Sequence, residues 1–184
     1  MAEAVRLKAL KGVRIVDVAV GERHCAAVSD LGEVFTWGYG GGAVTMEQGA
    51  LGHGDRTDQS RPALVDFFER EAVRAVRVTC GTEHTVVLSE DGQVFAFGEG
   101  ESGLLGNGLR ARSVPTLVDF PDRNSRFVHV AAGKGFTMAL DTGGKLWGWG
   151  KNGHGQLALG ENAVIDVHAS ESVPQEVTLL SEEL

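Results

Sequence analysis

Two glycine-rich stretches have the G-x-G-x-x-G spacing of a dinucleotide-binding loop, from Gly98 to Gly103 and from Gly148 to Gly153. That motif binds a pyrophosphate where a helix begins directly after it, because the helix N-terminus supplies N–H donors. The residues after the first stretch, Leu104 to Gly108, carry no helix signal. We therefore interpret both stretches as turns and expect no cofactor.

The remaining reactive side chains form no recognisable catalytic or metal-binding pattern. His53, His129, His154 and His168 are scattered, with no cysteine or carboxylate at ligand spacing. The sequence contains no nucleophile elbow and no His-Glu-x-x-His motif. We expect no enzymatic activity, no catalytic residue and no metal ligand.

The two cysteines, Cys25 and Cys80, lie 55 residues apart in apolar segments, which is typical of buried thiols in a reducing compartment. The N-terminus has no signal-peptide pattern, and no run of about 18 apolar residues predicts a membrane span. We expect a cytoplasmic or nuclear protein that does not associate with membranes. The formal net charge of −8 also argues against nucleic acid as a partner.

The feature that organises the sequence is an internal repeat. The segments Val16–Gly38, Val76–Gly98 and Val128–Gly150 align, with spacings of 60 and 52 residues. Each is followed by a glycine-rich turn and a Pro-x-x-Val element. The repeated columns include glycine, histidine and aromatic positions, namely Gly21, Gly81, Gly133, His24, His84, Trp37, Phe97 and Trp149.

The repeat has the pattern of four short strands. In the second copy, Val76, Val78 and Cys80 alternate with polar residues, which indicates a half-buried strand. Glu90-Asp91-Gly92 is a hairpin signal, and Pro115 to Phe120 supplies a fourth strand. The segment from Asp66 to Ala75 is compatible with a single helical turn.

Four strands in about 50 residues is the spacing of a propeller blade. We predict an all-β fold, a partial β-propeller of about three four-stranded blades in one repeat domain, residues 1–184. The expected blades are residues 1–60, 61–113 and 114–172, with residues 173–184 starting a fourth.

The repeated columns have structural interpretations. Glycines at Gly21, Gly81 and Gly133 are expected in turns, and the aromatic column, including Trp37 and Trp149, in packing. We expect the imidazoles of His24 and His84 to be buried and to bond a backbone carbonyl of the next turn.

The combined pattern resembles the regulator of chromosome condensation family of repeats. Cys80-Gly81, His84-Thr85 and Leu88 match the first part of the family motif, and Gly92, Val94, Phe97 and Gly98 match the second. The resemblance implies a β-propeller, usually of seven blades. The chain departs from the motif at Cys25 in place of Thr, Phe136 in place of His and Ala158 in place of Gly.

Two copies carry additional residues in loops, which are the positions where binding specificity tends to lie. We therefore choose as candidate partner-binding residues Tyr39, Met46, Glu47, Gln48, Glu161, Asp166 and His168.

An open arc of three blades leaves its end faces uncovered. We expect the remaining blades to come from another chain, a homodimer mate or a longer parent protein. The leading functional hypothesis is a protein–protein interaction scaffold with no chemistry of its own. The alternative, which the resemblance implies, is a guanine nucleotide exchange factor, or part of one, acting on a small GTPase.

Overall fold

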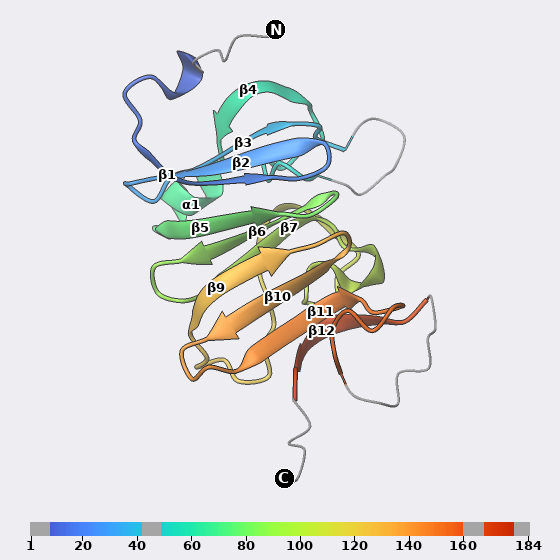
Figure 1. Ribbon diagram of the computed structural model, residues 1–184. Coiled ribbons are helices and arrows are strands. Elements are labelled where there is room, and N and C mark those ends of the chain that lie inside the picture. The colour runs from blue at the N-terminus through green and yellow to red at the C-terminus, as the bar shows by residue number, and fades with distance from the viewer. Residues whose placement is uncertain (1–7, 42–48, 160–167, 179–184) are drawn as a thin grey trace, which may run out of the picture.

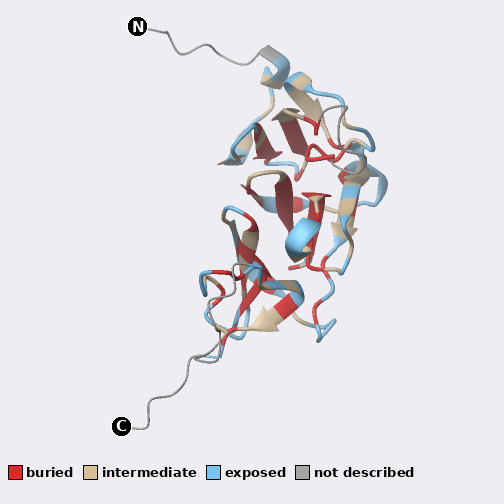
Figure 2. Ribbon diagram, turned by 90° about the vertical axis from the view of Figure 1, so that its right-hand side faces the viewer, coloured by how far each residue is buried: buried red, intermediate tan, exposed pale blue. Residues whose placement is uncertain are grey.

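The computed structural model describes residues 8–41, 49–159 and 168–178. These residues form three four-stranded antiparallel sheets, which follow one another along a curved arc (Figures 1 and 2). The prediction of an all-β partial propeller with three blades is confirmed. In the described ranges, no helix has the length and apolar character needed to cross a bilayer.

Each sheet is a blade whose strands pair in chain order. Blade 1 follows a short 3-10 turn, η1 (Lys8–Leu10), and contains β1 (Ile15–Val20), β2 (His24–Ser29), β3 (Val34–Gly38) and β4 (Gln59–Leu64). Blade 2 contains β5 (Ala75–Cys80), β6 (His84–Ser89), β7 (Val94–Glu99), the 3-10 turn η2 (Glu101–Gly103) and β8 (Ala111–Leu117). Blade 3 contains β9 (Phe127–Ala132), β10 (Phe136–Asp141), β11 (Leu146–Lys151) and β12 (Ser170–Glu176).

The Pro-led strands close the blades that precede them, and this differs from the boundaries expected from the sequence. Leu64 of β4 pairs with Phe35 of β3, and Leu117 of β8 pairs with Phe95 of β7. In the same way β12 pairs with β11, so residues 173–176 belong to the third blade and do not start a fourth. Proline is compatible with this outer position because an edge strand needs no N–H donor on its free side.

Two apolar cores lie between neighbouring blades, and Figure 2 shows buried residues concentrated there. The core between blades 1 and 2 includes Phe68 from a five-residue helix, α1 (Asp66–Arg70). This helix occupies the segment that the sequence left open to a single helical turn. The core between blades 2 and 3 includes Trp149 and two stacked rings, Phe120 and Phe127.

Candidate interaction sites

A buried histidine links each blade to the next. His24 Nε2 lies 2.9 Å from Thr85 Oγ1, and His84 Nε2 lies 3.1 Å from Thr137 Oγ1. The Thr85 hydroxyl donates to the carbonyl of Ala50, so it accepts the Nε2–H of His24. The expectation that these imidazoles bond a backbone carbonyl was therefore wrong. A threonine from the following blade takes that place because it faces the ring across the joint.

The glycine before each histidine is required by this arrangement. At Gly81 an added Cβ would overlap the His84 ring and lie 2.9 Å from the carbonyl oxygen of Gly133. Burial lowers the pKa of His84 to about 4, with a smaller contribution from His24. Burial likewise lowers the pKa of His24 to about 4. Both rings are therefore neutral at physiological pH, which suits a structural role.

Hydrogen bonds from backbone N–H groups cross both joints and connect the blades into one frame. On the inner strands, Asp17 Oδ2 accepts from the Val78 N–H at 2.9 Å, and Thr79 Oγ1 accepts from the Ala132 N–H at 2.9 Å. On the outer strands the glycine-rich turns donate to the following blade, Gly54 to Ser113 at 2.8 Å and Gly108 to Ser172 at 3.0 Å.

The dinucleotide-like stretches are part of this frame. Gly98 lies in β7 and is followed by the three-residue turn η2, while Gly148 and Gly150 lie in β11. Within the part of the chain that the structure describes, no α-helix begins directly after either stretch. Among the described residues, no group of three His, Cys, Asp or Glu side chains could hold a metal ion.

Most of the proposed partner-binding residues fall outside the described part of the chain, namely Met46, Glu47, Gln48, Glu161 and Asp166. Tyr39 follows β3, and the Arg23 guanidinium lies 4.0 Å from the centre of its ring. Arg23 also forms an ion pair with Glu83 of blade 2. This cluster was missed in the sequence because its members lie in three separate turns. His168 lies just before β12 and is partnered.

The tryptophans serve mainly in packing. Trp149 is fully buried and its indole N–H donates to the carbonyl of Leu104 at 3.1 Å. Trp147 is buried and donates to Asp141 Oδ2 at 3.1 Å. Trp37 is only half-buried, because it lies on blade 1, which has no preceding blade in this chain.

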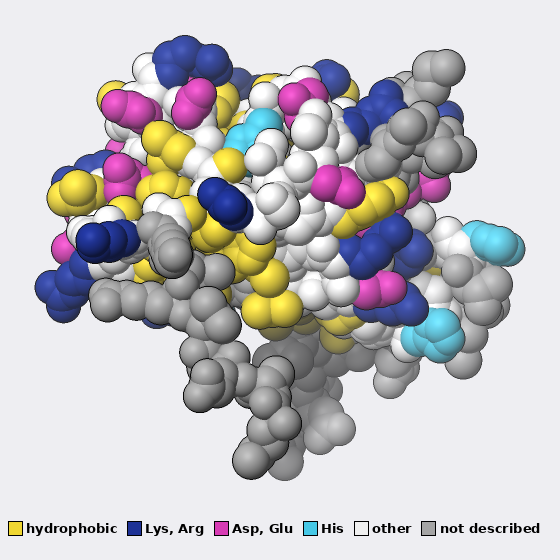
Figure 3. Space-filling view, turned by 90° about the horizontal axis from the view of Figure 1, so that it is seen from above, with side chains coloured by type: hydrophobic (Ala, Val, Ile, Leu, Met, Phe, Trp, Pro, Cys, Tyr) yellow, Lys and Arg dark blue, Asp and Glu magenta, His cyan; other side chains and the backbone are white. Residues whose placement is uncertain are grey.

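The outer face of blade 1, meaning the face of β1 that points away from blade 2, is apolar and exposed. Val18 and Val20 are 61% and 73% exposed, whereas Val78 and Cys80, which occupy the same positions in blade 2, are 6% and 7% exposed. Figure 3 looks onto this end of the molecule and shows hydrophobic side chains gathered there. The difference arises because blade 1 covers β5, while none of the described residues forms a blade that covers β1.

The two departures from the histidine and threonine columns lie at the two ends of the arc. Cys25, in the threonine column, is on blade 1, and Phe136, in the histidine column, is on blade 3. Both are half-buried, and Gly133 packs against the Phe136 ring. Neither end can therefore form the His–Thr hydrogen bond seen at the internal joints.

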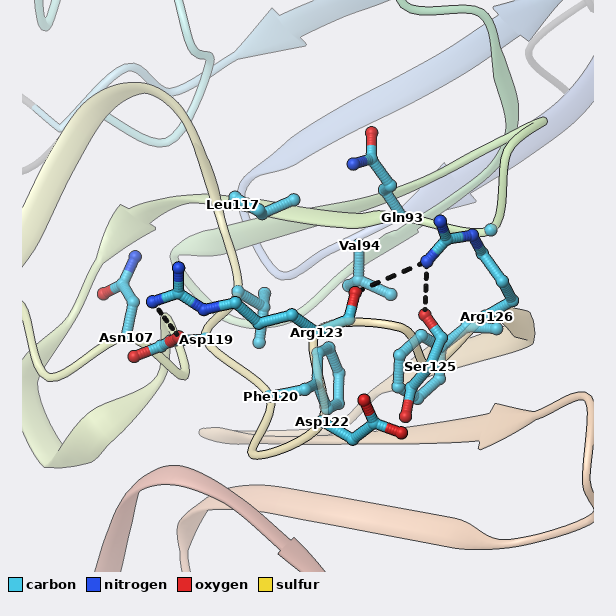
Figure 4. A pocket seen from close by; sticks show the side chains of 13 residues that line it. Gln93, Val94, Asn107, Leu117, Asp119, Phe120, Asp122, Arg123, Ser125 and Arg126 are labelled. Carbon is cyan, nitrogen blue, oxygen red and sulfur yellow. Dashed lines mark hydrogen bonds and ion pairs between the residues drawn. The ribbon is translucent and has the colours of Figure 1, made fainter.

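A pocket of about 370 Å³ opens between blades 2 and 3, on the side of the β6–β7 hairpin (Figure 4). Its apolar wall consists of Val94, Leu117, Val118, Phe120 and Phe127, and its polar residues include Gln93, Asn107, Asp119, Asp122, Arg123, Ser125 and Arg126. The pocket was not predicted from the sequence, because its walls come from three segments that meet only in the fold.

The pocket's rim is ordered by its own hydrogen bonds. Asp122 Oδ1 accepts from the Asn124 N–H, and the Arg126 guanidinium donates to the carbonyls of Asn124 and Ser125 at 3.2 and 3.1 Å. Arg123 and Asp119 approach to 4.0 Å at the mouth, where both side chains are exposed. Arg123 therefore keeps most of its charge accessible to solvent.

Comparison with known sequences agrees with the blade architecture. Residues 32–88, 91–140 and 143–183 each match the pattern described as the Regulator of chromosome condensation (RCC1) repeat. The chain is thus a segment of a repeat-built β-propeller. It belongs to the RCC1 repeat family.

Relatives carry these repeats in longer proteins. The chain is 37% identical over 158 residues to the ultraviolet-B receptor UVR8 of Arabidopsis thaliana, covering 85% of the chain and 34% of the receptor. It is 31% identical over 185 residues to mouse Protein RCC2, covering 96% and 34%. The E3 ubiquitin-protein ligase HERC2 of Homo sapiens is 36% identical over 166 residues, covering 88% of the chain and 3% of the ligase.

Solved structures give the same fold. Human WBSCR16 superimposes with a TM-score of 0.71 at 26% identity, covering 93% of this chain and 41% of that one. Prp20p of Saccharomyces cerevisiae, studied for its binding to Gsp1p and histones, gives a TM-score of 0.67 at 22% identity and covers 90% and 38%. The chain therefore spans about a third of UVR8 and RCC2 and about two fifths of these two structures.

Proposed function

We propose that this chain is a protein-interaction scaffold, a propeller segment that binds through its surfaces and carries no chemistry of its own. The observation that carries the proposal is the outer face of blade 1. Val18 and Val20 are more than half exposed there, whereas their counterparts in blade 2, Val78 and Cys80, are buried against blade 1. Exposed apolar surface of this kind is typical of a binding interface.

The outer face is suited to a further four-stranded blade. That blade can be supplied by another chain, a second copy or a longer parent protein. The frame of His–Thr and backbone hydrogen bonds then holds the loops of the arc in fixed positions for a separate protein partner. A cytosolic or nuclear setting is part of the proposal and agrees with the two free cysteines.

Light scattering on the purified chain tests this proposal. We expect a concentration-dependent mass above the 19.5 kDa of one chain. The double variant Val18→Lys and Val20→Lys should lower that mass to one chain with an unchanged far-UV circular dichroism spectrum. Val114→Lys, which changes a 40% exposed valine on the outer strand β8, is the matched control and should leave the mass unchanged. A mass of one chain at all concentrations would exclude a second copy of this chain as the occupant of this face.

Guanine nucleotide exchange on a small GTPase is the second candidate, and membership of the RCC1 repeat family favours it. Exchange needs no catalytic side chain in this chain, because a bound protein surface can displace the nucleotide. The release of fluorescent GDP from a panel of small GTPases distinguishes the two functions. Acceleration at micromolar protein would establish exchange, whereas retained binding without acceleration would support scaffolding alone.

A further inference from the structure

The linker between blades 1 and 2 places a buried aromatic side chain, Phe68, at a position where the linker between blades 2 and 3 has no aromatic residue. Phe68 of α1 is 1% exposed and packs in one cluster with Val34, Val65 and Ala75. The residue at the corresponding place in the next linker is Pro121, which is exposed. The first joint is therefore filled by a ring from its own linker.

The corresponding residues of the second joint line the open pocket. Val94, Val118 and Phe127 occupy the repeat positions of Val34, Val65 and Ala75. The linker of residues 119–126 contains no helix and contributes one ring, Phe120, which stacks on Phe127 with centroids 4.0 Å apart. A volume of about 370 Å³ remains beside this pair.

We infer that this pocket accepts an aromatic side chain from a short segment of a partner protein, in the role that Phe68 plays at the first joint. The volume is near the lower end of the range for ligand-binding pockets, which is about 300–1,000 Å³. An aromatic ring inserted into an apolar pocket with a polar rim is the usual anchor of a protein interface. The inference rests on the proposed interaction function and adds a site and a partner chemistry to it.

The rim carries Asp119, Asp122 and Arg126 as well as Arg123, and of these Arg123 offers an accessible positive charge to a residue beside the aromatic ring. The Arg123 side chain is 89% exposed and reaches Asp119 only at 4.0 Å, so it can pair with a carboxylate of the incoming segment. In α1, Glu69 directly follows Phe68. The partner segment is therefore expected to carry an acidic residue beside its aromatic residue.

The chain itself supplies the probe for this test. An acetylated, amidated peptide with the sequence of residues 66–71, Asp-Phe-Phe-Glu-Arg-Glu, is titrated into the protein, and methyl resonances are followed by NMR. We expect saturable shifts at Val94, Leu117 and Val118. Replacing the second phenylalanine of the peptide by alanine should weaken binding by about tenfold or more, because a buried ring contributes about 1.5–3 kcal/mol.

Two protein variants locate the binding. Ser125→Trp should fill the pocket from its rim and abolish the shifts, and Leu117→Ser should weaken binding about fivefold by removing a 48% exposed wall residue. Val114→Ser, on the same strand but outside the pocket, should bind as the unchanged protein does. If the alanine peptide binds equally well, if Ser125→Trp still binds, or if the shifts appear at Val18 and Val20, the inference is wrong. These outcomes do not depend on the mass measured by light scattering, so either hypothesis can fail without the other.

Discussion

Substitution of Gly81 by alanine tests the packing that joins blades 2 and 3. The added Cβ overlaps the ring of His84, which is fully buried, and approaches the carbonyl oxygen of Gly133 to 2.9 Å. His84 must therefore move away from its hydrogen bond with Thr137. Forcing one extra carbon into a packed core costs about 1–3 kcal/mol. Leaving a buried hydroxyl without its partner costs about 1–3 kcal/mol.

Because the two effects share one displacement, we expect the free energy of unfolding to fall by about 2–4 kcal/mol in total. Urea denaturation followed by far-UV circular dichroism measures this as a lower midpoint. Gly143→Ala is the matched control, because its added Cβ meets only Asp141 Oδ1 at 3.3 Å. Its midpoint should stay close to that of the unchanged protein.

A second variant distinguishes the steric overlap with the His84 ring from the effect of replacing a glycine as such. In the double variant Gly81→Ala and His84→Ala the ring is absent, so only the 2.9 Å approach of the added Cβ to the Gly133 carbonyl oxygen remains. Gly81→Ala should therefore cost less stability when it is added to His84→Ala than when it is made in the unchanged protein. Equal midpoints for Gly81→Ala and Gly143→Ala, or additive losses in the double variant, would refute the argument.

Two further predictions follow from the buried polar groups. Burial lowers the pKa values of His24 and His84 from about 6.5 in the unfolded chain to about 4 in the folded chain. Between these pH values the unfolded state binds more protons than the folded state. The free energy of unfolding therefore falls as the pH decreases from about 6.5 to 4. Each histidine should lower the free energy of unfolding by up to about 3 kcal/mol at pH 4. In the double variant His24→Gln and His84→Gln, the urea midpoints measured at pH 7 and at pH 4.5 should therefore converge. An unchanged pH dependence of the midpoint in this variant would contradict the explanation. Asp141 accepts the Trp147 indole N–H and two backbone N–H groups, so Asp141→Asn should destabilise the chain by about 1–2 kcal/mol, measured by the urea midpoint of tryptophan fluorescence. Asp91→Asn, in the corresponding hairpin of blade 2, should have no effect, and an equal loss would show that the indole bond contributes nothing.

The repeat made much of the fold predictable. Alternation in segments such as Val76–Cys80 and hairpin signals such as Glu90-Asp91-Gly92 are local features, and strand type depends on them. Three copies of the same pattern then fix the number of blades, because each copy must form the same unit. The family follows from the same columns.

Strand pairing was less accessible to sequence analysis. The Pro-led strand could close one blade or open the next, since both arrangements have the same local pattern. Only the pairing of β12 with β11 decides this. The partner of the buried histidines was also hidden, because Thr85 and Thr137 reach them from the following blade.

The sequence by itself determined the blade unit, its turns and its aromatic core, because these depend on residues within one repeat. The tertiary structure decided which surfaces are free. Val18 and Val78 have the same residue type and the same place in the repeat, and only the presence of a neighbouring blade makes one exposed and the other buried. The pocket beside Phe120 likewise depends on how two blades and a linker meet. Such features are set by contacts between repeats, which a pattern within one repeat does not encode.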